Sequence, residues 1–522
     1  MWIEVLPREV LGMSSSSDAT SRNAGFVRRV KAGIRQRTFY GLSVVAICVV
    51  GGAVTFQVAQ SMLRHLVFKY EVKGWAEGFF LYNALQLSRG ENMYPDPDNE
   101  AATGLPYGFL YQLLQAPFVR IFGPQLWIGR GISILAAVLS LGWVFRTATK
   151  RAGSVVAGLV GVFLSCAEYF STGGSWDWGH ADSLYMALGF GALMCVEPPL
   201  ARRGWRIAAA VLLSCASCCA KQTGVGFVLA VATTLLFTEW RLAVLYMVVT
   251  GLVMVSTVAI WQALSDGHFL QYTVGMFLGD PYALSRLIPL TTTLLRDAPV
   301  LVIAGVWQLK RDPVGSAGRD PIVWALFWVG SASVAAVVKA GGWLNSLMPV
   351  YFLLSVPAGV LLGKTIATRK PGAVFKLLAT GAVLGQLLLT EFLFCWNAAQ
   401  TQRHLRFWYE RGGQLIEAEL RNPQERVFIS HRVSFAVRTG HRLYDSTWFL
   451  RPTTKERLKS RIADHFFDKA LVPLEHFQNE SDEVLQLLAI RYRVERIIQP
   501  EVSLIGYTPM LVFVPRKAGD SG

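Results

Sequence analysis

The chain has 522 residues, of which 52% are hydrophobic and 16% charged, and its mean hydropathy is +0.38. Soluble domains carry about 25% charged residues, so this composition excludes an ordinary soluble protein and indicates several membrane-spanning helices. The net charge of +15 does not favour a nucleic-acid partner, because Lys and Arg gather at the ends of apolar runs.

The N-terminal part of the chain predicts a tail, a span and a long loop. Residues 1–38 are polar and basic and have no apolar run, which indicates a cytoplasmic tail. A first span is expected at about 39–60. The first outer loop, 61–127, is rich in aromatic residues and prolines. An amphipathic run inside it predicts a helix that lies in the membrane interface.

Further apolar runs continue to residue 395 and are separated by short basic segments that indicate cytoplasmic loops. We therefore predict an all-α polytopic membrane domain, residues 39–395, with about eleven transmembrane helices. The spans after the first are expected at about 128–145, 154–171, 182–196, 207–237 (two spans), 242–262, 297–309, 321–363 (two spans) and 374–395.

Residues 396–522 have the composition of a soluble domain, which the charge rule places on the extracytoplasmic side. The runs at 426–430, 469–477 and 510–515 predict strands, and the run at 453–467 predicts an amphipathic helix. A small α/β or α+β domain is expected. The seven cysteines lie in or beside apolar runs, so no disulfide framework is visible.

Glu77 is the best candidate for a catalytic carboxylate in the first outer loop. It is followed by Gly78 and an amphipathic run, so it would lie at the start of an interfacial helix, where the helix dipole favours an anion. The alternative is a capping or solvated glutamate.

The stretch GGSWDWGHADS, residues 173–183, is the second candidate. Asp177 and Asp182 flank His180 immediately before a span, and polar groups at membrane depth are costly and mark functional sites. Carboxylates and imidazole also ligate divalent metals, but the spacing alone is weak evidence, so we expect no metal. The other alternative is that Asp182 caps the span and Asp177 is solvated.

Two lysines lie at separate outer turns, Lys221 beside Gln222 and Lys339 close to Asn345. A lysine buried near a membrane surface needs an anionic partner, which could be a lipid headgroup, Asp177 or the phosphate of a substrate. The sequence has no Walker loop, GxSxG, HExxH or GxGxxG motif, so no soluble cofactor is expected.

Five segments in order resemble the GT-C superfamily of integral-membrane glycosyltransferases, in particular the bacterial relatives of protein O-mannosyltransferases and of the lipid A aminoarabinose transferase. They are AEGFFLYNALQLSRGENMY, PYGFLYQLLQAPFVRIFGPQLWIGRGIS, WDWGHADSL, AKQTG and KAGGWLNSLMP. Relatives commonly carry an Asp beside the Glu of the first segment, where this chain has Gly74 and Ala76. Glu71 and Asp177 are therefore alternatives to Glu77.

The resemblance implies a multi-pass protein of the inner (plasma) membrane. It would transfer a sugar from a polyprenyl-phosphate-linked donor to a lipid, polysaccharide or protein acceptor on the extracytoplasmic face, with inversion. The residues assigned on this basis are Glu77, Asp177 and Asp182 as catalytic, Lys221, Arg130, His180 and Lys339 at the donor phosphate, and Gln222, Asn345 and Tyr82 at the substrate.

Two other functional classes compete with this assignment. Many spans with a few charges also suit a transporter or lipid flippase. A non-catalytic scaffold with the same fold is the second alternative, because fold does not imply function. The charges gather at the outer ends of the predicted spans and no half-to-half repeat is visible, which favours the transferase.

Overall fold

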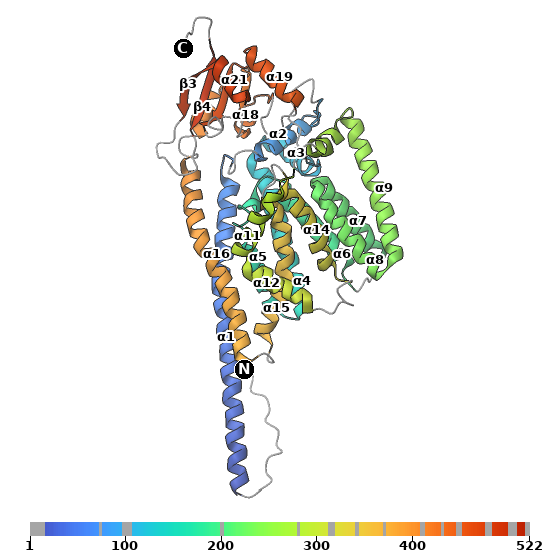
Figure 1. Cartoon of the computed structure of the whole chain (residues 1–522), viewed down its shortest axis with the longest axis vertical. Helices are drawn as coiled ribbons and strands as arrows, with labels where there is room; N and C mark the ends of the chain where they lie inside the picture. The colour runs from blue at the N-terminus through green and yellow to red at the C-terminus, as the bar shows by residue number, and fades with distance from the viewer. Residues whose placement is uncertain are drawn as a thin grey trace.

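The computed structural model of the chain is mostly helical and carries a small sheet near the C-terminal end (Figure 1). The parts of the chain that the structure describes are residues 16–71, 76–96, 107–198, 203–278, 282–311, 319–339, 344–368, 372–407, 413–429, 433–444, 452–474, 483–498 and 509–516.

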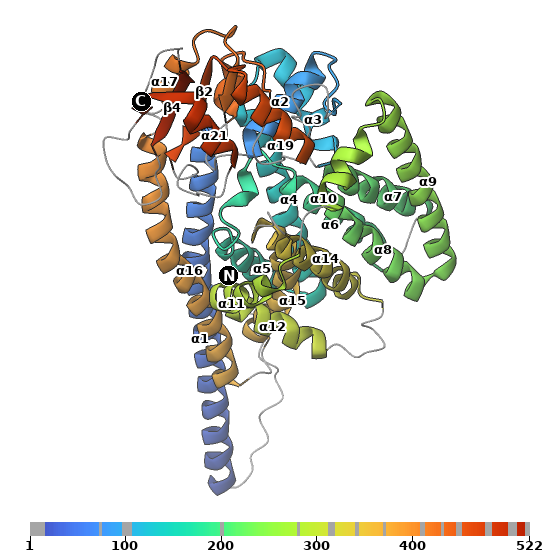
Figure 2. The same cartoon turned by 45° about the horizontal axis from the view of Figure 1, so that its top comes forward.

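Two long helices, α1 (Ser16–Val67) and α16 (Ala373–Phe407), lie side by side along one flank of the molecule (Figures 1 and 2). Helix α1 begins inside the segment predicted as a polar tail, and α16 continues past the predicted end of the membrane domain. No proline interrupts either helix, so nothing in the backbone forces it to stop at the edge of its apolar run.

Helix α15 (Met348–Ala367) is the most buried candidate span of the described chain and packs against α5 (Val155–Ala167) and α12 (Pro299–Arg311), among others. Gly359 and Gly363 lie one turn apart on α15 and face the backbone of α5 at Ala157. A Cβ at either position would overlap Ala157, so these glycines allow the two helices to approach closely, as small residues do in membrane bundles.

The remaining bundle elements are the helices α4 (Leu126–Ala152), α5 (Val155–Ala167), α6 (Asp182–Val196), α7 (Arg203–Ala220), α8 (Val225–Thr238), α9 (Trp240–Leu264), α10 (Met276–Leu278), α11 (Leu287–Asp297), α12 (Pro299–Arg311) and α14 (Pro321–Val338), with short 3₁₀ or π turns at Ser175–Asp177, Gln222–Gly224, Gln271–Gly275, Leu284–Arg286 and Leu344–Leu347.

Six helices of the described chain are long and apolar enough to cross a membrane, or seven if α11 and α12, which meet at 93°, form one broken span. This confirms a multi-pass membrane protein. Four shorter apolar helices occur within 155–167, 182–196, 204–220 and 222–238. Eleven spans are reached only if the bent pair and all four shorter helices cross, so that number stays a prediction.

Helix α3 (Leu110–Phe122) has the amphipathic pattern expected for the first outer loop. It buries Gln112, Gln115 and Val119, while large apolar side chains on its other side are exposed. An apolar side left uncovered by protein is typical of a helix that lies in the membrane interface. Helix α2 (Ala76–Ser88) is formed by the run after Glu77 that was predicted to lie in the membrane interface. It is instead buried on most sides and packs against the C-terminal domain, so this prediction is wrong.

The sheet of the C-terminal domain has the strand order β1 (Val427–Ile429), β2 (Lys469–Pro473), β4 (Met510–Pro515), β3 (Tyr492–Ile498). Strands β1 and β2 are parallel, and the other two pairs are antiparallel. Helices α17 (Gly413–Glu419), α18 (Ser434–Arg438), α19 (Pro452–Ala463) and α21 (Glu483–Arg491) complete the described part of the domain.

All three predicted strands and the predicted helix are confirmed in this domain. Strand β3 was missed, because its residues 493–497 are exposed in succession and show no alternation of apolar and polar positions. The described part of the domain buries its own apolar cluster, which includes Phe428, Leu458 and Phe513.

Candidate active site

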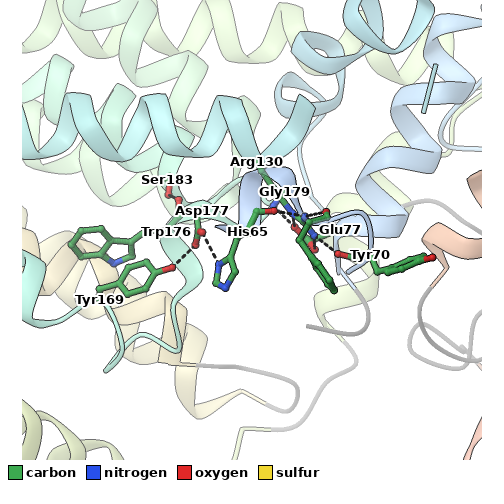
Figure 3. A network of polar contacts seen from close by, with 10 residues as sticks. His65, Tyr70, Glu77, Arg130, Tyr169, Trp176, Asp177, Gly179 and Ser183 are labelled. Atoms are coloured by element: carbon green, nitrogen blue, oxygen red, sulfur yellow. Dashed lines mark hydrogen bonds and ion pairs between the residues drawn. The ribbon is translucent and has the colours of Figure 1, made fainter. Parts of the chain in front are cut away.

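Glu77 lies in a buried ion pair at the end of the bundle next to the C-terminal domain. Arg130, in the first turns of α4, donates from Nε to Oε1 and from Nη2 to Oε2 of Glu77, both at 2.7 Å (Figure 3). The backbone N–H of Gly179 also donates to Oε1, at 3.0 Å. Both charged side chains are at most 1% exposed. The alternative of a solvated Glu77 is therefore wrong.

Arg130 also binds the C-terminal end of α1. Its Nη1 donates to the carbonyl oxygens of His65 and Phe68 at 2.5 Å, and its Nη2 donates to the carbonyl of Tyr70 at 2.6 Å. Together with the bonds to Glu77, these acceptors use all five N–H donors of the guanidinium. This arrangement favours a positioning role for Arg130 over the predicted contact with a donor phosphate.

Asp177 is fully buried and bonded through both oxygens. Oδ2 lies 2.7 Å from Nδ1 of His65, at the end of α1, and Oδ1 accepts the hydroxyl of Tyr169 at 2.8 Å (Figure 3). The alternative of a solvated Asp177 is wrong. His65 and Tyr169 were missed in the sequence, where the one available signal was a histidine at the end of the first apolar run.

The carboxylate of Asp182 contacts several of the predicted site residues. Oδ1 accepts Nζ of Lys221 at 2.5 Å, and Oδ2 accepts Nδ2 of Asn345 at 2.8 Å. Nδ1 of His180 also lies against Oδ2 of the same carboxylate. Helix α6 begins at Asp182 with Ala181 in the N-cap position, and both oxygens of Asp182 bond other side chains, so the capping alternative is wrong. The ammonium of Lys221 lies 5.5 Å and 5.6 Å from the ring centroids of Tyr107 and Tyr185, within range of a cation–π interaction.

The stretch 173–183 joins the Glu77 cluster to the Asp182 cluster. Gly179 bonds Glu77, while the neighbouring His180 packs its ring against Phe80 and Tyr107. Gly174 has a φ of 70°, which glycine adopts without strain, and this turn brings the chain back toward the bundle. A short segment thus contributes to both charged clusters.

Three of the predicted residues have described contacts elsewhere. The carbonyl of Lys339 accepts Nη1 of Arg286 at 2.6 Å, and the ammonium lies 6.0 Å from the ring of Tyr282. Gln222 donates to the carbonyl of Thr273 at 2.9 Å. Tyr82 lines a cavity between α2 and residues 440–442 of the C-terminal domain. Their assignments to the donor and substrate stay predictions.

Among the described residues, no group of three His, Cys, Asp or Glu side chains is arranged to hold a metal ion. Asp177 bonds His65 and Tyr169, whereas His180 pairs with Asp182. The two aspartates of the Asp-x-x-His-x-Asp pattern therefore have different partners.

The C-terminal domain contacts the segment that carries this site. The backbone N–H of Ser434, at the start of α18, donates to Oε1 of Glu71 at 2.7 Å. The Phe435 ring stacks on Tyr70 at 5.0 Å, and Nη1 of Arg438 donates to the carbonyl of Lys69 at 2.8 Å. Because the Tyr70 carbonyl is bonded to Arg130, helix α18 reaches the Glu77 cluster through one residue.

We expect Arg438→Ala to loosen the C-terminal domain. The substitution removes the bond to the Lys69 carbonyl, the ion pair with Glu417 and the contact with the Tyr70 ring, which together stabilise docking by about 1–2 kcal/mol. Limited trypsinolysis of the protein in detergent should release the domain faster than from the wild type. Arg421→Ala, at an exposed position, is the control. Equal rates for both variants would contradict the docking role.

Neither a model of a protein family nor a curated protein sequence matches the chain. Solved structures of ArnT from Cupriavidus metallidurans do match. In the apo state the TM-score is 0.59 at 14% identity, and the match covers 89% of this chain and 97% of ArnT. With undecaprenyl phosphate bound, the TM-score is 0.56 at 13% identity, with coverage of 91% and 97%.

Because the match spans most of both chains, it includes the helical bundle and the C-terminal domain together. At this level of identity the likeness establishes the architecture. The chain therefore shares the overall fold of ArnT, in agreement with the resemblance found in the sequence.

Proposed function

We propose that the chain is a membrane glycosyltransferase that moves a sugar from a polyprenyl-phosphate-linked donor to an acceptor hydroxyl on the extracytoplasmic face. The observation that carries this proposal is that residues 177–182 bond both a buried carboxylate, Glu77, and a buried ammonium, Lys221. It occurs in a fold shared with ArnT, one structure of which holds undecaprenyl phosphate.

Glu77 is suited to the role of general base. Its carboxylate is held by Arg130 and by the Gly179 N–H, so its orientation is fixed before substrate binds. In an inverting transfer, the carboxylate takes the proton of the acceptor hydroxyl while that oxygen attacks the anomeric carbon. The bond from this carbon to the donor phosphate breaks at the same time, and the phosphate leaves with the electron pair.

Lys221 is suited to stabilising the phosphate that leaves. An ammonium has three N–H donors, so one bond to Asp182 leaves it able to bind a phosphate oxygen. Asp182 also bonds Asn345, which keeps Asp182 aligned with Lys221. A fixed positive charge in a site largely closed to water stabilises developing negative charge more than it would in solution.

The proposed location follows from the charge rule. The end of the bundle that carries Glu77, Asp182 and the C-terminal domain would face the extracytoplasmic side, with the N-terminus in the cytoplasm. Arg151 and Asp320 form an ion pair, at 2.6 Å, at the end of α4 remote from Arg130, where the sequence places basic cytoplasmic loops. A polyprenyl phosphate in the membrane would then reach the site from the surrounding lipid.

Deleting the gene provides the direct test. We expect envelope glycoconjugates of the deletion strain to lack one sugar, and a polyprenyl-phosphate sugar to accumulate, as measured by mass spectrometry of glycans and lipids. A plasmid copy of the wild-type chain should restore both. Unchanged glycans together with an unchanged lipid pool would reject the transferase. Accumulation of the lipid donor on the cytoplasmic side alone would instead support a flippase.

Lys221→Ala should weaken binding of a short-chain prenyl phosphate by about tenfold or more, because a charge-assisted hydrogen bond to the phosphate is lost. Binding to the purified protein in nanodiscs is measured by titration, with thermal unfolding recorded in parallel. Lys150→Ala is the control, since this half-exposed lysine pairs with Glu197 at the other end of α4. Equal affinity in the Lys221 variant and the wild type would remove Lys221 from the donor site.

A further inference from the structure

A cavity with a mixed polar and apolar lining lies between helix α2 and the C-terminal domain. Its volume is about 410 Å³. The C-terminal half of α2 and the residues that follow, Arg89 to Pro95, form one wall, and Gly440–Arg442 form the other. We call it the α2 cavity. Glu77, Asp182 and Lys221 do not line it, so the proposed transfer reaction does not account for it.

The buried side chains of the α2 cavity are polar. Tyr82, Gln86 and His441 are between 3% and 9% exposed. Oε1 of Gln86 is buried and accepts no hydrogen bond from the described residues. Nδ1 of His441 lies 2.9 Å from the hydroxyl of Thr439. Burial lowers the pKa of His441, so its imidazole is neutral at pH 7. A buried acceptor such as Oε1 favours a ligand that brings hydroxyl donors.

The exposed residues of the α2 cavity give it a net positive charge. Arg89 and Arg442 line it together with one acidic residue, Glu91. Burial raises the pKa of the Tyr82 hydroxyl, and a hydrogen bond with the backbone of Leu443 lowers it. Guanidinium groups bind carboxylate and phosphate groups in a bidentate manner.

We infer that the α2 cavity binds a saccharide that carries an acidic group, and that this saccharide is part of the acceptor. The identification of this saccharide with the acceptor rests on the proposed function. Buried polar side chains would bind the sugar hydroxyls, and the two arginines would bind the carboxylate or phosphate. A purely apolar ligand fits less well, because it would leave Oε1 of Gln86 buried without a hydrogen bond.

The distance between the α2 cavity and Glu77 determines how far along the acceptor the bound saccharide lies from the reacting hydroxyl. Glu77 lies in the first turn of α2, and Gln86 lies nine residues later on the same helix. At 1.5 Å rise per residue, this separation is about 14 Å along the axis. The part of the saccharide that binds Gln86 would therefore lie a few sugar units from the hydroxyl that accepts the transferred sugar.

Titration of the full-length protein in nanodiscs tests the inference. The probes are trigalacturonate and, as the neutral sugar of the same length, maltotriose. We expect the wild type to bind trigalacturonate more tightly than maltotriose. Arg442→Glu and Gln86→Leu should each weaken trigalacturonate binding by about tenfold. Arg421→Glu makes the same charge change at an exposed position outside the cavity and should bind as the wild type does.

Each result decides the inference. Equal affinity for the two sugars, no binding of trigalacturonate, or full affinity in both cavity variants would overturn it. The wild type is also titrated with a uronate attached to diacylglycerol in the nanodisc. Tighter binding of this lipid than of trigalacturonate would indicate a lipid-linked acceptor, and equal or weaker binding would indicate a free glycan. Prenyl phosphate binding by the wild type is measured in the same discs. If it persists without trigalacturonate binding, the inference fails while the proposed function stands.

Discussion

Glu77→Gln is expected to lower sugar transfer by about 10²–10⁴-fold, the usual effect of losing a general base. The amide keeps the size of the side chain but cannot take the proton from the acceptor. The measurement is the rate of sugar transfer by the purified protein in nanodiscs with membrane-extracted donor lipid. Prenyl phosphate binding should be retained, because Lys221 and Asp182 remain in place.

Two matched variants distinguish Glu77 from the other carboxylates. Glu71→Gln keeps the oxygen that accepts the Ser434 N–H, so the docking of α18 should survive and transfer should continue. Asp177→Asn disturbs the contacts with His65 and Tyr169, and we expect a smaller loss of transfer than for Glu77→Gln. Full transfer by Glu77→Gln combined with loss in either of the others would reassign the base.

Arg130→Met should destabilise the protein by about 3–5 kcal/mol, because removing one partner of a buried ion pair leaves an uncompensated charge. Glu77 would be that charge, at 1% exposure. The carbonyls of His65, Phe68 and Tyr70 also lose their donor. Thermal unfolding in detergent, followed by tryptophan fluorescence, measures the effect.

The control for Arg130 lies on the same helix. Arg146 pairs with Glu197 and its side chain is 50% exposed, so Arg146→Met should cost less than about 1 kcal/mol. Combining Arg130→Met with Glu77→Gln should restore part of the stability, because the buried charge is then gone. Similar unfolding temperatures for the two single arginine variants would show that the Glu77–Arg130 pair does not hold the site together.

The two variants separate positioning from chemistry. Glu77→Gln removes the proposed base but leaves most partners of Arg130, whereas Arg130→Met keeps the carboxylate and removes what holds it. If Glu77 is the base and Arg130 positions it, both variants lose transfer. The arginine variant should lose more stability, because in Glu77→Gln the guanidinium keeps its three carbonyl acceptors.

The sequence by itself determined where most of the apolar helices lie. Helices α6, α9 and α16 begin within two residues of the predicted spans, because length and hydrophobicity are local properties of a segment. Three strands were found for the same reason, since their apolar runs are continuous. Strand β3 was not found, because five of its residues are exposed and only its pairing with β4 makes it a strand.

The sequence also indicated which charged residues matter but not which of them pair. Asp182, His180, Lys221 and Asn345 were all candidates because each is a polar group at the end of an apolar run, and the tertiary structure brings them together. Arg130 was a candidate for the donor phosphate, yet its described donors all bond Glu77 and the end of α1.

Pairing could be decided only by the tertiary structure. Glu77 and Arg130 are 53 positions apart, and His65 and Asp177 are 112 positions apart. A buried charge must find a partner, but local sequence does not say which of many distant residues supplies it. Helix packing makes that choice, because it brings the end of α1, the start of α4 and the turn at Gly179 to one point beside α2.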